Sequence, residues 1–156
     1  MKMTLLLILF YSFSALGQSL HDTRILKISD RKRSIFIDKG IFHYESNASN
    51  QSLENVRNSY DASRGYERLV FDFAGGAAPR VYGMINQDEK KLYIDFFDTS
   101  IGNQLKTLKN TKYVKSLDFF TLDVKDLSVE LNFKEKVSFD IFMLMNPARL
   151  VIDVKK

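Results

Sequence analysis

A recurring six-residue phrase constrains this chain more than any other feature of its sequence. It is RLVFDF at residues 68–73, KLYIDF at 91–96 and RLVIDV at 149–154. In each copy, alternate apolar residues share one face of a strand, while the basic residue and the aspartate lie on the other face. This period of two predicts strands that are buried on one side and carry charges outside, where the charges pair across strands.

Alternating segments and turn sequences follow one another regularly from residue 68 onward. Gly, Asn, Asp and Pro occupy the breaks between the segments. Short strands at this spacing predict an all-β fold, an antiparallel sandwich or barrel. The expected strands are 68–74, 80–85, 91–97, 113–120, 127–133, 137–144 and 149–154, after a leading strand near 23–29.

The segment 44–67 interrupts this pattern. It is rich in Asn and Ser, which predicts a long surface loop. Within the loop, Ser52 can cap a short helix that carries Leu53, Val56 and Tyr60 along one side. We therefore expect an irregular insertion that holds one short helix.

The spacing of the phrases predicts an internal duplication. The phrases at 68 and 91 enclose one further strand, RVYGMI, and the related phrases at 128 (SVELNF) and 149 enclose VSFDIFML. Two similar three-stranded units would form two similar sheets that pack face to face. We therefore expect one domain over 18–156, with its core at 68–156.

The first 17 residues are typical of a secretory signal. Lys2 supplies the positive charge, Leu5–Phe13 the apolar stretch, and Ala15-Leu16-Gly17 the cleavage site. The apolar stretch is shorter than the ~20 residues of a membrane-spanning helix, and Gln18 stands where a lipoprotein would have cysteine. We expect a periplasmic protein; the alternative is an uncleaved membrane anchor.

Composition argues against several classes of function. The formal net charge is +4, but the densest basic cluster is only DRKR at 30–33, and nucleic-acid binding requires a concentrated basic stripe. The two histidines, His21 and His43, are too few for a catalytic zinc site, and the chain has no cysteine. No nucleophilic serine elbow occurs either. We therefore expect a protein that is not an enzyme and that uses no metal or cofactor.

The repeated aspartates allow two interpretations. Asp72, Asp95 and Asp153 occupy equivalent positions and could converge as a carboxylate cluster for acid–base chemistry or cation binding. Alternatively, a nearby Arg or Lys neutralises each of them. We favour the second interpretation, because a shared packing role explains the repetition.

The order of these phrases resembles the AMIN domain of bacterial envelopes. NPARLVIDV at the end of the chain is the closest match, and KKLYIDF is a looser one. The resemblance implies a β-sandwich of two similar sheets. AMIN domains accompany N-acetylmuramoyl-L-alanine amidases and type IV pilus secretins, and help to place them in the periplasm through peptidoglycan. The segment 44–67 has no counterpart in the family, and no amidase or secretin sequence follows the last expected strand.

Peptidoglycan presents acetamido sugars and anionic peptides, so a binding site needs Arg or Lys for carboxylates and aromatic faces for sugars. The ligand-binding residues that we expect are Arg80 and Tyr82, followed by Tyr93, Tyr113 and Lys115. The alternative function is a protein–protein module that pairs an edge strand with a secretin, an amidase or another envelope protein, without glycan binding.

Overall fold

The computed structural model describes residues 24–28, 34–103, 105, 108–123 and 125–156. The expected signal peptide lies outside these residues. Every regular element among the described residues is a strand, so none of them forms a helix long and apolar enough to span a membrane. The strands are β1 (Ile25–Lys27), β2 (Gly40–Tyr44), β3 (Gln51–Asp61), β4 (Tyr66–Phe73), β5 (Val81–Asn86), β6 (Lys91–Phe96), β7 (Thr99–Ile101), β8 (Val114–Asp123), β9 (Asp126–Phe133), β10 (Ser138–Leu144) and β11 (Arg149–Lys155).

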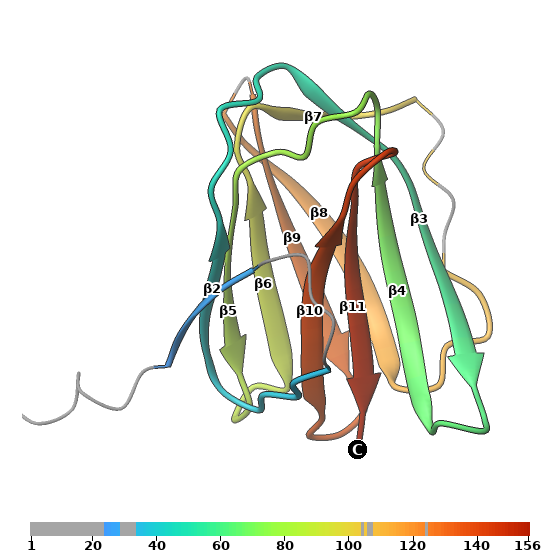
Figure 1. Ribbon diagram of the computed structural model, residues 1–156. Coiled ribbons are helices and arrows are strands. Elements are labelled where there is room, and N and C mark those ends of the chain that lie inside the picture. The colour runs from blue at the N-terminus through green and yellow to red at the C-terminus, as the bar shows by residue number, and fades with distance from the viewer. Residues whose placement is uncertain (1–23, 29–33, 104, 106–107, 124) are drawn as a thin grey trace, which may run out of the picture.

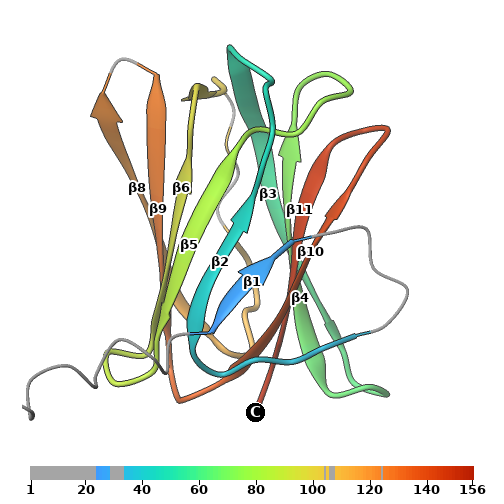
Figure 2. The same ribbon diagram turned by 60° about the vertical axis from the view of Figure 1, so that its left-hand side comes forward.

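Two sheets pack face to face, which confirms the predicted all-β sandwich (Figures 1 and 2). Sheet A has the strand order β1-β2-β5-β6-β9-β8, and sheet B the order β10-β11-β4-β3-β7. Their inner faces enclose a core rich in phenylalanine, in which the Phe96 ring lies 5.8 Å from that of Phe71 and 5.2 Å from that of Phe73. The alternation seen in the sequence supplies these inward side chains.

The sheets are mixed rather than wholly antiparallel. Most neighbouring strands are antiparallel, but β1 pairs with β2 in parallel, and β3 pairs with β7 in parallel. Both parallel pairs involve a three-residue strand at a sheet edge. Such short strands give weak alternation signals, so the sequence alone did not reveal how they pair.

The two predicted units do not each form their own sheet. Strand β4, from the first unit, joins β10 and β11 in sheet B, while β9, from the second unit, joins β5 and β6 in sheet A. The connections from β4 to β5 and from β9 to β10 therefore cross between the sheets. That part of the prediction was wrong, because alternation identifies strands without specifying which strands pair.

An internal repeat is nevertheless present, and its unit has four strands. Lys91 on β6 pairs with Asn132 on β9, just as Arg149 on β11 pairs with Asp72 on β4. The strands β8 and β3 complete the two halves, and each carries a bulge at the same point of its register with β9 or β4. Sheet A and sheet B therefore share a four-stranded arrangement, β5-β6-β9-β8 and β10-β11-β4-β3.

The predicted loop with a short helix at 44–67 was wrong, because residues 51–61 of this segment form strand β3 and none of the segment is helical. A bulge between Leu53 and Asn55 inserts one residue and turns both Leu53 and Val56 toward the core. The resulting three-residue spacing imitates a helix. The same spacing separates Val114 and Leu117 around the equivalent bulge in β8.

Candidate ligand site on the outer face of sheet A

Two of the five predicted ligand-binding residues, Tyr82 and Tyr93, lie on the outer face of sheet A, and a third, Arg80, adjoins this face. Tyr82 projects outward from β5, 41% exposed, between His43 of β2 and Asp95 of β6 in the strand register. Tyr93 occupies the outer face of β6 and is half-buried; it pairs with Met84, which is 41% exposed, as is Tyr82. Alternation along two neighbouring strands therefore creates a surface of aromatic and apolar side chains among polar ones.

Arg80 adjoins this surface and is held in a defined position. It directly precedes β5, and its carbonyl oxygen accepts a hydrogen bond of 3.0 Å from the amide of Phe97, which directly follows β6. The Arg80 guanidinium carbon lies 4.1 Å from the centroid of the Phe97 ring. This cation–π contact orients the planar guanidinium. Because Arg80 is exposed, the N–H groups of the guanidinium remain accessible to a ligand.

A polar hollow of about 300 Å³ lies beside Arg80. The segment 45–48, Arg80, Phe97 and Asp98 line it. The wall is fixed by the Ser46 hydroxyl, which donates to the Ala78 carbonyl oxygen at 2.6 Å and accepts from the Ala48 amide at 3.1 Å. The hollow therefore presents one guanidinium next to carboxylates and polar backbone.

Tyr93 is more constrained than Tyr82. Its hydroxyl donates a 2.6 Å hydrogen bond to Glu89, and this bond raises the pKa of the tyrosine. The neighbouring Lys91 ammonium lies 2.8 Å from the carboxylate of Glu130, and the hydrogen bond between them lowers the pKa of Glu130. The polar groups around Tyr93 are therefore largely paired with one another. Arg80 and Tyr82 are the residues that offer a ligand more accessible contacts.

The remaining two predicted residues do not join this group. Tyr113 is buried, 7% exposed, with its ring edge-on to Tyr60 at 6.2 Å, and burial raises the pKa of its phenol. The structure therefore does not offer Tyr113 to a ligand on the surface. Lys115 is exposed, but it lies on β8 beside a different groove.

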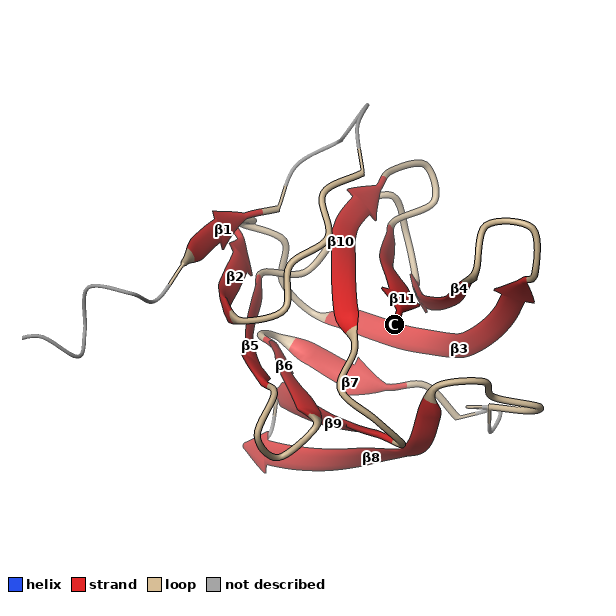
Figure 3. Ribbon diagram, turned by 90° about the horizontal axis from the view of Figure 1, so that it is seen from below, coloured by secondary structure: helices blue, strands red, loops and turns tan. Residues whose placement is uncertain are grey.

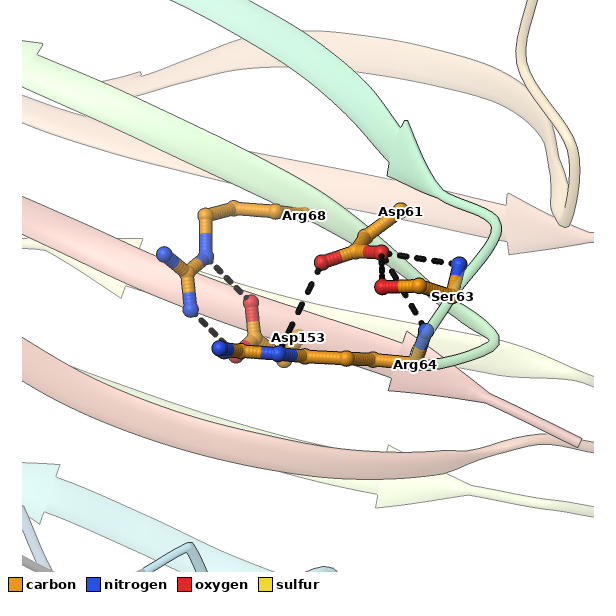
Figure 4. Close-up of polar contacts among 5 residues, drawn as sticks. All are labelled: Asp61, Ser63, Arg64, Arg68 and Asp153. Atoms are coloured by element: carbon orange, nitrogen blue, oxygen red, sulfur yellow. Dashed lines mark hydrogen bonds and ion pairs between the residues drawn. The ribbon is translucent and has the colours of Figure 1, made fainter.

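The repeated aspartates do not converge. Asp72 and Asp153 lie on sheet B, whereas Asp95 lies on sheet A and accepts a 2.7 Å hydrogen bond from the Ser128 hydroxyl. Arg68 holds Asp153 through two bonds of 2.6 and 2.7 Å (Figure 4). Arginine therefore neutralises two of the three aspartates, Asp72 being paired with Arg57 at 2.8 Å, as the favoured interpretation predicted.

Nor do the described residues assemble a site for metal chemistry. Among them, no group of three or more His, Asp or Glu side chains is arranged to hold a metal ion. His43 lies 3.2 Å from the Glu45 carboxylate through its Nδ1 atom. His21 lies outside the described residues.

Sequence reasoning missed Phe97, Glu45 and Asp98 as neighbours of Arg80. A signal for Phe97 existed, since it continues the outward alternation of Lys91, Tyr93 and Asp95 past the end of β6. No comparable signal existed for Glu45, because the sequence did not predict β2 or its pairing with β5.

Comparison with known proteins identifies no family. No family model matches the sequence, and no curated protein matches it.

Proposed function

We propose that the protein is a non-catalytic, AMIN-like module of the bacterial cell envelope that binds peptidoglycan and so positions envelope machinery. The observation that carries the proposal is the Arg80 guanidinium stacked on Phe97, with the exposed Tyr82 two residues further along the chain. A guanidinium suits the carboxylates of peptide stems, and an exposed tyrosine ring suits the apolar face of an acetamido sugar.

Two further features support this proposal. The repeated sheets accord with the arrangement that the AMIN resemblance implies. The N-terminal segment 1–17 has the pattern of a secretory signal, and export would bring the protein to the cell wall.

Co-sedimentation with purified peptidoglycan sacculi across a salt series tests the proposal. We expect retention that persists at high salt and that falls at least about tenfold in Arg80→Ala and Tyr82→Ala, equivalent to about 1.4 kcal/mol. Arg64→Ala is the matched control, because Arg64 is an exposed arginine on the hairpin between β3 and β4, in the other sheet.

Two results would contradict the proposal. Retention that disappears at moderate salt, and that Arg64→Ala weakens as much as Arg80→Ala, would mean that general positive charge is responsible. No retention at any salt would leave the alternative, a protein–protein module without glycan binding.

A further inference from the structure

Strand β8 leaves a long edge of sheet A open. It has ten residues and pairs with β9 on one side, and no other strand of the described residues pairs with its second side. Figures 2 and 3 show β8 at the outer rim of the molecule. The backbone N–H and C=O groups on such an edge are a template for an added strand.

The internal repeat shows how the equivalent edge is treated in sheet B. Strand β3, the counterpart of β8, is covered at its beginning by β7. Further along, the side chain of Asn58 accepts a hydrogen bond from the Lys109 amide at 3.2 Å and donates one to its carbonyl oxygen at 2.9 Å, which ties the linker to β3. On β8, the residue at the Asn58 position is the apolar Phe119.

Within the part of the chain that the structure describes, only the beginning of β8 is occupied in a comparable way. The buried carboxylate of Glu67 accepts hydrogen bonds from the amides of Lys112, Tyr113 and Val114, at 3.0, 2.7 and 3.3 Å. The open part of the edge therefore begins at Lys115.

An apolar groove of about 410 Å³ lies along the inner side of this open edge. Leu117 and Phe119 point inward from β8 and form part of its wall. In a strand added to β8, every second side chain would also point inward and would therefore enter the groove. The lining residues are Leu105, Leu108, Thr111, Val114, Lys115, Ser116, Leu117 and Phe119.

The charge at the mouth of the groove favours an acidic ligand. Lys115 is exposed there, and no carboxylate of the described residues forms an ion pair with it. The length of the ligand is limited as well, because bulges interrupt β8 after Val114 and after Thr121. The regular stretch 116–121 suits a short added strand and does not favour extended sheet growth.

We propose that β8 is the docking edge for a short extended segment of a partner protein. The segment adds to sheet A as a further strand, inserts a large apolar side chain into the groove, and places a carboxylate near Lys115. A second copy of this chain suits the groove poorly, because the inward residues of its own β8, Leu117 and Phe119, already pack against its own core. The proposal does not depend on peptidoglycan binding, since Arg80 and Tyr82 are not part of this edge.

The test uses the purified protein and a phage-displayed library of random decapeptides. We expect enriched peptides in which large apolar residues alternate with polar ones and a carboxylate lies nearby. Affinity of these peptides should fall at least about tenfold in Lys115→Glu. Lys39→Glu is the control, because Lys39 is an exposed lysine next to β2, away from the groove. In the unaltered protein, bound peptide should slow amide hydrogen exchange within 116–121.

Three results would overturn the proposal. The first is no enrichment of any peptide. The second is enriched peptides that leave exchange at 116–121 unchanged, or that Lys39→Glu weakens as much as Lys115→Glu. The third is a homodimer in which the amides of 116–121 are already protected without peptide. The effect of Arg80→Ala on sacculus binding tests only the proposed peptidoglycan binding. It does not test the proposal that β8 binds a partner strand.

Discussion

Glu67 makes the clearest test of how the two halves of the sandwich are joined. Its side chain is fully buried on β4, and its two oxygens accept four hydrogen bonds. One oxygen accepts from Asn58 and Lys112, and the other from Tyr113 and Val114. The carboxylate therefore fixes the segment that leads into β8 against strand β4 of sheet B.

The substitution Glu67→Gln keeps the shape of the side chain but turns one acceptor oxygen into a donor. Whichever oxygen is replaced, two N–H donors lose their partner in a buried site. Hydrogen bonds to charged groups contribute about 1.5–3 kcal/mol each, and part of this loss is offset because a neutral amide costs less to bury. We expect a loss of about 3 kcal/mol in the free energy of unfolding, which corresponds to a fall in Tm of about 6–12 °C for a domain of this size.

Urea denaturation followed by circular dichroism measures this change, since the chain has no tryptophan to serve as a fluorescence probe. Glu54→Gln is the control, because Glu54 is exposed on β3, and we expect it to change stability by less than about 0.5 kcal/mol. Amide exchange at 112–114 should also accelerate in Glu67→Gln. The reasoning would be refuted if Glu67→Gln were as stable as Glu54→Gln, or if exchange at 112–114 did not change.

Two further predictions concern packing and ion pairs. Gly83→Ala should lower the free energy of unfolding by about 1–3 kcal/mol in urea denaturation, because a Cβ there would overlap the buried Phe42 ring. Gly76→Ala, where the nearest atom to the added Cβ is Asn146 Oδ1 at an ordinary van der Waals distance of 3.9 Å, should change it little, and equal losses would contradict the packing argument. In double-mutant cycles, Arg68 should couple to its aspartate more strongly than Arg57 does, because the carboxylate bound by Arg68 is 5% exposed and that bound by Arg57 is 24% exposed. Equal coupling energies would mean that burial does not strengthen the Arg68 pair.

Much of the fold could be predicted from the sequence because alternation is a local property. The seven strands expected from residue 68 onward correspond to β4, β5, β6, β8, β9, β10 and β11. In the same way, alternation placed Arg80 and Tyr82 on one face, since residues two apart on a strand point to the same side. The same rule placed the repeated aspartates on the faces turned away from the core, although Asp153 is buried there beside Arg68.

Bulges and short edge strands were beyond this reasoning. In β3, one inserted residue changed the apolar spacing from that of a strand to that of a helix, although the backbone remained extended. Strands as short as β7 carry too few residues to show a period. Side-chain alternation does not predict the backbone conformation of a segment where hydrogen bonds to a neighbouring strand determine that conformation.

The sequence by itself determined that this chain forms strands with one apolar and one charged face. Only the tertiary structure decided which strands pair, that each half of the repeat contributes strands to both sheets, and that Glu45, Arg80 and Phe97 meet from three separate segments. It also decided that Glu67 and Tyr113 are buried. The physical reason is that alternation reflects the geometry of a single strand, whereas pairing and burial depend on contacts between residues far apart in the chain.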